Sequence, residues 1–210
     1  TITLNITSEG DLIVRAPFGT SPKFIEDLVE QKRIWIEEKI KVIEDRRVRH
    51  TKKEFKAGEE FLFLGEAYIL RFSKQAKEIK IEGKNLVLPN CNKKQAESYI
   101  KEWYRNEARQ IFSKRVEYFA SLQNISYKAV KITGASKRWG SCSSKGNLNF
   151  TWKLVMAPLQ VIDYVVVHEL CHIEHPNHSK YFWAKVKQIN PDYKLKQKWL
   201  AENQKILEIM

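Results

Sequence analysis

The stretch PLQVIDYVVVHELCHIEHPNH, residues 158–178, predicts the element around which the rest of the chain is arranged. Pro158 favours the first turn of a helix, and apolar residues then follow nearly all round its surface, so we expect this helix to be buried. Pro176 cannot continue a helix and ends it. Four of the five histidines of the chain fall within residues 168–178. The same helix therefore indicates where the chemistry of the protein lies.

His168, Glu169 and His172 form the pattern H-E-x-x-H within this predicted helix. Side chains four residues apart share a helix face, so the imidazoles of His168 and His172 can bind one metal ion. Glu169 is turned by about 100° from His168 around the axis, which lets it reach a bound water without binding the metal. This pattern predicts a catalytic zinc site with Glu169 as its general base, although histidine nitrogens also bind other divalent ions.

A third metal ligand has to come from chain that turns back toward the helix. His175 lies about 10 Å along the helix axis from His168, which is too far for a shared ion. Pro176 forces the chain to turn, so that His178 can swing toward the metal. We favour His178, with His175 and Glu202 as the alternatives. A surface histidine patch or a structural metal site is the other interpretation, but structural zinc sites usually contain cysteine.

The segment SKRWGSCSS, residues 136–144, is flanked by Gly134 and Gly146 and precedes the metal-binding helix. A strand beside that helix can pair with an extended peptide through its backbone. The segment is explained equally well by a turn, in which glycine provides backbone conformational freedom and serine forms local hydrogen bonds. The predicted substrate-binding residues are Arg138, Trp139, Ser141 and Tyr181. The donors considered for a developing oxyanion are Tyr181, Asn177 and Arg138, without a ranking.

Composition and cysteine usage restrict the class of protein. The 43% of apolar and 11% of aromatic residues exclude a disordered chain. Three cysteines exclude a disulfide scaffold and suit a reducing compartment. We interpret Cys171 as a small buried residue, and Cys142 as a weaker candidate for a further zinc ligand. With no run of about 18 apolar residues and no visible secretion signal, we expect a cytoplasmic protein without membrane contact. The oligomeric state is not indicated.

The charge is concentrated in the second part of the chain. The formal net charge is +12, and residues 91–210 hold 20 basic and 10 acidic side chains. No acidic residue occurs between Tyr118 and Ile162. Such a basic field attracts polyanions, so nucleic acid is a predicted partner, although scattered lysines also serve solubility. The basic residues of this interval are Lys128, Lys131, Lys137, Arg138, Lys145 and Lys153.

The order of elements predicts an α+β fold. Alternation and turn residues predict hairpins over residues 2–14, 61–72 and 79–88. Helical periodicity predicts helices over 22–46 and 93–121. Strands are expected over 127–132 and 148–156, and helices follow to a last one over 195–208. We expect a strand-rich layer with one helix over residues 1–90 and a catalytic core over residues 91–210.

The segment RWGSCSSKGNLNFTWKLVMAP and the following HELCHIEHPNHSKYFW resemble the YgjP-like zinc metallopeptidases. That family is a branch of the zincins and is related to the SprT-like and WLM proteases, and the resemblance covers residues 134–183. It implies a zincin-like core, Zn²⁺ bound by His168, His172 and His178, and Glu169 as general acid and base. The chain does not follow the metzincin pattern, because His175 stands where that pattern has glycine.

The resulting functional hypothesis is a zinc-dependent metallopeptidase that hydrolyses peptide bonds in peptide or protein substrates. SprT-like proteases act on protein attached to DNA, so the alternative is a nucleic-acid-associated protease that cleaves DNA-bound or crosslinked protein. A metal-binding interaction module without turnover is the third hypothesis.

Overall fold

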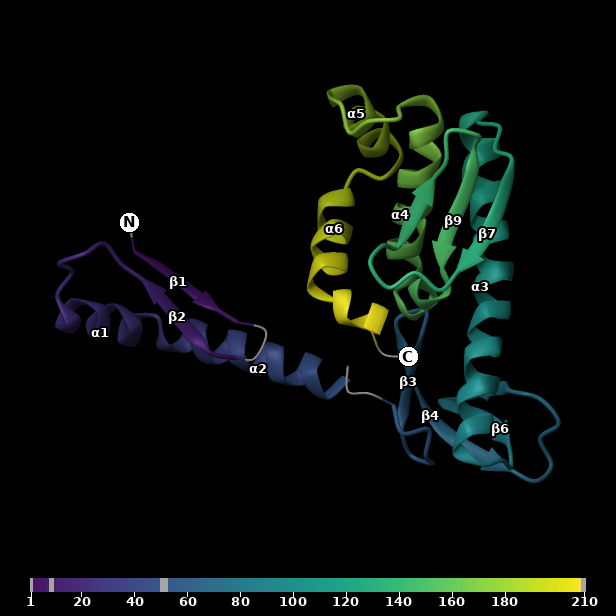
Figure 1. Cartoon of the computed structure of the whole chain (residues 1–210), viewed down its shortest axis with the longest axis horizontal. Coiled ribbons are helices and arrows are strands. Elements are labelled where there is room, and N and C mark those ends of the chain that lie inside the picture. Colours follow the sequence, from purple (N-terminus) through teal and green to yellow (C-terminus); the bar gives the residue numbers. More distant parts are fainter. Residues whose placement is uncertain (1, 8–9, 50–52, 209–210) are drawn as a thin grey trace. The chain divides into compact units, whose positions relative to one another are not determined.

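A computed structural model describes residues 2–7, 10–49 and 53–208 of the chain (Figure 1). The internal contacts divide the chain into two compact units, Thr1–Thr51 and Lys52–Met210. These units differ from the expected ranges 1–90 and 91–210, because the strands before residue 90 share a hydrophobic core with the helices after it.

The first unit consists of an antiparallel hairpin and two helices. The hairpin is formed by β1 (Thr3–Ile6) and β2 (Leu12–Arg15), as predicted. The single helix expected over 22–46 is instead divided into α1 (Pro22–Gln31) and α2 (Arg33–Arg49). The division falls at Lys32, whose φ of −100° and ψ of 6° leave regular helical geometry. The apolar periodicity continues across this break and therefore conceals it.

The second unit begins with a four-stranded sheet in the order β3-β4-β6-β5. Both predicted hairpins are confirmed, because β3 pairs with β4 and β5 pairs with β6 in antiparallel fashion. The sheet is completed by a parallel pairing of β4 with β6, which joins the two hairpins. Its strands are β3 (Glu60–Phe63), β4 (Glu66–Ser73), β5 (Lys80–Glu82) and β6 (Asn85–Pro89).

The long helix α3 (Lys93–Gln123) follows this sheet and extends along the second unit (Figure 1). Asn92 starts it through a capping box with Gln95, in which each side chain accepts a hydrogen bond from the backbone of the other residue. Eight of its residues are buried and form one face, as the sequence periodicity predicts.

A three-stranded sheet in the order β7-β9-β8 packs beside α3 and α4 (Leu159–Glu174). Its strands are β7 (Ala129–Thr133), β8 (Gly140–Cys142) and β9 (Asn147–Thr151). The predicted strand over 148–156 ends at Thr151 and continues as the 3-10 helix η1 (Trp152–Met156). All five residues of η1 are buried.

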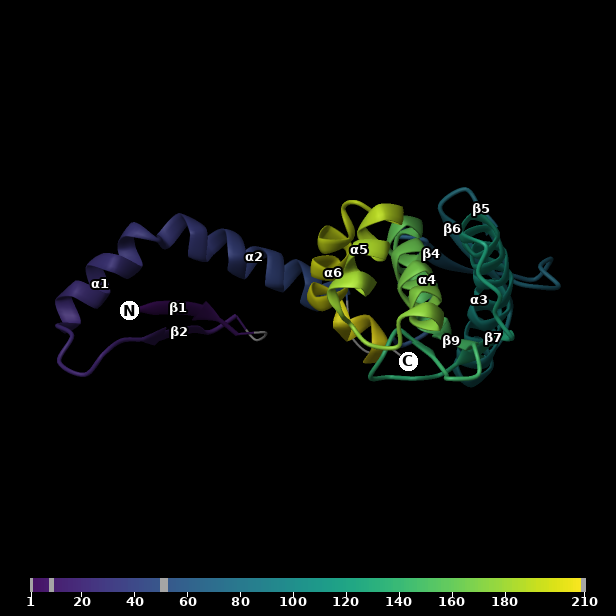
Figure 2. The same ribbon diagram turned by 90° about the horizontal axis from the view of Figure 1, so that it is seen from above.

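The buried helix predicted after Pro158 is confirmed as α4, which ends at Glu174, two residues before Pro176. It lies between α3 on one side and α5 (Lys180–Ile189) and α6 (Tyr193–Glu202) on the other (Figure 2). The last helix expected over 195–208 is shorter, because α6 ends at Glu202 and the 3-10 helix η2 (Gln204–Glu208) follows. No helix within the described ranges is both long and apolar enough to cross a bilayer.

Two contacts fix the position of α4. The guanidinium of Arg115 on α3 forms two hydrogen bonds, of 2.5 and 2.8 Å, to the carboxylate of Asp163 on α4. Gly65 in the β3–β4 turn has a φ of 85° and lies so close to Pro158, directly before the first residue of α4, that a Cβ would be 2.9 Å from Cγ of Pro158. An ion pair with α3 and a turn that only glycine fits therefore fix the position of α4.

Candidate metal centre

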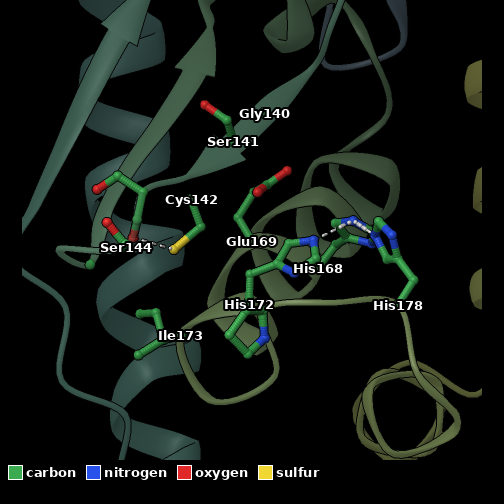
Figure 3. Close-up of a pocket in the computed structure, with 12 residues that line it drawn as sticks. Gly140, Ser141, Cys142, Ser144, His168, Glu169, His172, Ile173 and His178 are labelled. Carbon is green, nitrogen blue, oxygen red and sulfur yellow. Dashed lines mark hydrogen bonds between the residues drawn. The ribbon is translucent and has the colours of Figure 1, made fainter.

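Three histidine side chains from two segments converge at the C-terminal part of α4 (Figure 3). His168 and His172 lie one turn apart on the helix, and their Nε2 atoms are 3.3 Å apart. His178 lies in the chain between α4 and α5, and its Nε2 is 3.1 Å from Nε2 of His168. The candidate ligand atoms of all three residues lie within 4.8 Å of one another. The turn after Pro176 thus brings His178 to the helix.

The spacing and tautomers of these imidazoles fit a metal ion. A tetrahedral zinc site with bonds of about 2.0–2.1 Å to nitrogen places its ligand atoms about 3.3 Å apart. Nδ1 of His172 lies 3.2 Å from the carbonyl oxygen of His175, to which it donates when it carries the proton. Nε2 of His172 then presents its lone pair to the other two histidines, as a metal ligand must.

Burial keeps two of the histidines in the neutral form that binds metal. Burial, followed by the charges of His172 and His178, lowers the pKa of His168 to about 3. Burial is also the main reason why the pKa of His172 is lowered. Both directions follow from the cost of placing a cationic imidazole away from water and beside like charges.

Glu169 points from α4 toward strand β8 and is only 6% exposed. Burial raises the pKa of its carboxyl to about 8, against the opposing effects of Arg138 and of a hydrogen bond from the backbone N–H of Cys142. A carboxyl with its pKa near neutrality can both accept and return a proton. A divalent cation nearby would favour the carboxylate form.

Strand β8 approaches Glu169 closely because residue 140 is glycine. A Cβ on Gly140 would lie 2.6 Å from Oε1 of Glu169 and 2.8 Å from its Cγ. By contrast, a Cβ on Gly134 would meet no atom nearer than 3.7 Å. The glycine of the RWGSC segment is therefore required for the approach of the strand to the carboxyl.

The backbone of β8 also faces the centre. Trp139 accepts a hydrogen bond from Thr151, and Ser143 donates one to Asn147, so the odd-numbered residues pair with β9. Backbone groups alternate along an antiparallel pair, so Gly140 and Cys142 direct theirs away from β9. In agreement with this direction, the backbone N–H of Cys142 acts on Glu169 and lowers the pKa of its carboxyl. β8 is the edge strand of its sheet.

A pocket of about 590 Å³ lies between β8 and α4 and includes the three histidines and Glu169. Of the predicted substrate-binding residues, Ser141 lines it. Trp139 is half-buried on the same strand segment, and Arg138 is exposed but close enough for its charge to act on Glu169. Tyr181 is 64% exposed and, like Asn177, is not among the residues that line the pocket.

The other residues considered as metal ligands, His175, Glu202 and Cys142, lie outside the group of three histidines. His175 follows the last residue of α4 and provides the carbonyl beside His172, and Glu202 ends α6. Among the described residues, the group able to hold a metal contains only the three histidines. Cys142 lines the pocket without joining that group, and Cys171 is fully buried, as predicted.

The sequence interpretation placed the segment with Gly140 beside the helix but did not name Gly140 as a site residue. It also did not name Ser143, Ser144, Gly146, Ile173 and Pro176 as residues of this pocket. Ile173 follows directly after His172, so its position next to the motif was the only signal for its role. The two glycines around SKRWGSCSS drew attention to that segment, but nothing in its spacing indicated which residue contacts Glu169.

Comparisons with known proteins give one match, to a protein family. No curated protein and no solved structure matches the chain significantly. A family model described as "YgjP-like, metallopeptidase domain" matches residues 1–203, which is nearly the whole chain. A metallopeptidase requires a metal ion, and the cluster of three histidines can hold one. The chain belongs to the YgjP-like metallopeptidase family.

Proposed function

We propose that the protein is a zinc-dependent peptidase with a zincin-like core, in which His168, His172 and His178 hold Zn²⁺. The observation that carries this proposal is the convergence of three Nε2 atoms at the spacing of a tetrahedral site. Three protein ligands leave one position for water or substrate, as catalytic zinc sites do. Cysteine-rich structural sites lack this open position.

Zinc at this position would lower the pKa of a bound water and polarise the scissile carbonyl group. Glu169 accepts the proton from the attacking water and then transfers it to the nitrogen of the leaving amine. The N–H of Cys142 holds the carboxylate in place during both transfers. The charge of Arg138 acts on Glu169, and in this proposal it also adds positive charge near the developing oxyanion.

The substrate backbone is proposed to pair with the outer edge of β8. The N–H and carbonyl of Gly140 and the carbonyl of Cys142 face that side, while the N–H of Cys142 is directed to Glu169. An extended peptide adds to such an edge through main-chain hydrogen bonds. The pocket beside the strand then receives side chains of the substrate. Its lining combines Ser141 and Ser143 with the apolar Ile173 and Pro176.

The direct test is Glu169→Gln, which keeps the size of the side chain and removes its ability to accept a proton. We expect zinc content to remain at one ion per chain and hydrolysis of a casein substrate to fall by about 10²–10⁴-fold. Zinc is measured by mass spectrometry of the metal and hydrolysis by release of labelled peptides. Equal turnover by the variant and the wild type would remove the assigned role of Glu169.

A second proposal is that the peptidase acts on protein bound to nucleic acid. The acid-free interval between Tyr118 and Ile162 supports it, because five of its six basic residues are exposed. The exception is Lys153, which is only 5% exposed on η1 and cannot contribute to a phosphate-binding surface. The exposed residues of this interval are Lys128, Lys131, Lys137, Arg138 and Lys145.

Salt dependence tests the second proposal. Three phosphate contacts predict that affinity for a DNA duplex falls by about 40-fold between 50 and 200 mM salt. Replacing Lys128, Lys131 and Lys145 with Gln should weaken binding at low salt and reduce this dependence. Binding that is equally strong at both salt concentrations, or unaffected by the substitutions, would contradict nucleic-acid contact at this surface.

A further inference from the structure

Phe182, on the first turn of α5, contacts all three histidines of the metal centre. Its side chain is fully buried, and its ring centroid lies 4.9 Å from that of His168, 4.6 Å from that of His172 and 4.8 Å from that of His178. The ring is stacked on His172 and meets the other two imidazoles edge to face. One apolar side chain thus forms a common support for the three ligands.

His178 depends on aromatic packing more than the other two ligands do. It is exposed and lies outside regular secondary structure, whereas His168 and His172 belong to α4. Its imidazole is stacked on the ring of Trp183, with centroids 5.5 Å apart and planes inclined by 19°. Trp183 comes directly after Phe182, so the first turn of α5 supports His178 with two neighbouring rings.

The stack continues from Trp183 to α6 and back to α4. Trp183 lies on Tyr193 at 5.2 Å, and Tyr193 lies on Tyr164 at 6.4 Å. The hydroxyl of Tyr164 is 3.5 Å from Nδ1 of His168. A continuous set of rings therefore connects His178, which lies between α4 and α5, with His168 on α4.

The orientation of α5 is itself fixed. The hydroxyl of Ser179 accepts a hydrogen bond from the backbone N–H of Phe182 and caps the helix next to His178. Lys185 on α5 forms an ion pair with Glu174 on α4. Phe182 and Trp183 are thus held where they can limit the rotation of the imidazoles.

We propose that Phe182 and Trp183 are positioning residues that hold the three imidazoles in the metal-binding arrangement before the metal arrives. This inference rests on the proposed function, because it assigns a role toward the same metal ion. Ligands that are already ordered lose less conformational freedom on binding, and surrounding residues that orient ligands typically contribute 10- to 100-fold in metal affinity.

The test measures zinc affinity of the full chain by competition with a chromophoric chelator. Phe182→Leu and Trp183→Leu remove a ring, and Trp183→Phe keeps one. Val186→Ala is the matched control, because Val186 is fully buried one turn further along the same helix and has no ring contact with the histidines. The melting temperature of each metal-free protein and the absorption spectrum of its cobalt(II) form are recorded in parallel.

The proposal expects about 10- to 100-fold weaker zinc binding for both leucine variants, near-normal binding for Trp183→Phe and unchanged binding for Val186→Ala. The cobalt(II) spectrum should change only in the leucine variants. Wild-type affinity in Trp183→Leu, which is half-buried and the safer variant to fold, would overturn the proposal. The proposal would also be overturned if zinc binding weakened in Val186→Ala as much as in the leucine variants, in proportion to the loss of melting temperature. Absence of metal binding in the wild type would instead overturn the proposed function itself.

Discussion

The two sides of the metal centre are positioned in different ways. On α4, a single helix sets the positions of His168, Glu169 and His172 through its period of 3.6 residues. On the other side, His178 reaches the same place through a turn and through packing on Phe182 and Trp183. The first side depends on local backbone geometry, whereas the second depends on contacts between elements. The second side is therefore the part that substitutions can disturb while the core stays folded.

Removal of one ligand should have the largest effect and should separate the two sides. Each ligand of a three-histidine site carries about a third of the binding free energy, so His168→Ala and His178→Ala should each weaken zinc binding by on the order of 10²–10³-fold or more. His178→Ala leaves the pair on α4 intact, whereas His168→Ala leaves two ligands from different segments. Chelator competition should therefore rank His168→Ala as the weaker binder.

The reverse order of these two variants would show that the helix pair is not the stronger half of the centre. His175→Ala is the control, because its side chain is outside the metal-binding group and only its backbone carbonyl meets His172. That variant should bind zinc with nearly wild-type affinity.

Gly140→Ala should separate catalysis from metal binding. The added methyl group would lie 2.6–3.0 Å from atoms of Glu169, so the carboxylate must move. A displacement of about 1 Å costs about 10²-fold in rate. The three atoms nearest to the added methyl group all belong to Glu169 and none to a histidine. We expect kcat to fall by about 100-fold and zinc affinity to stay within a few-fold of the wild type.

The matched control is Gly134→Ala, in the same segment, where the nearest atom would be 3.7 Å away. Steady-state kinetics on a quenched fluorescent peptide, together with metal titration, measure both quantities. A normal kcat in Gly140→Ala would mean that strand β8 yields and that its close approach does not position Glu169.

Zinc removal should produce the smallest of these effects. The loss of stability should be mainly on the side of His178. At a zinc concentration of 100 times Kd, binding stabilises the folded chain by about 2.7 kcal/mol. Without zinc, α4 is still held by the core and by the pair of Arg115 with Asp163. Amide hydrogen exchange should accelerate in residues 175–183 and change little in residues 161–172. Equal acceleration in both segments would show that they open together.

The sequence predicted the parts of this centre that depend on local spacing. The buried helix after Pro158 and the shared face of His168 and His172 follow from periodicity and from proline. The approach of His178 also followed from Pro176. The contact of Gly140 with Glu169 was not predictable, because it depends on how β8 and α4 pack, and no spacing along the chain encodes that distance.

The same distinction applies to the fold. Hairpins with short turns were predicted, since their pairing is local. The parallel pairing of β4 with β6 joins strands from different hairpins and was missed. The end of β9 at Thr151 was missed as well, because the apolar residues of η1 suit a buried strand as much as a buried 3-10 turn.

Strand β8 has a consequence for how such an enzyme can evolve. Its backbone holds the Glu169 carboxylate through Cys142 and, in the proposed function, also receives the substrate chain. Under that proposal, a substitution that shifts β8 to fit a different peptide also shifts the carboxylate that serves as the general base. Changes in specificity and in rate are linked by one short strand, so new preferences are expected to arise more readily from the opposite wall of the pocket, at Ile173 and Pro176.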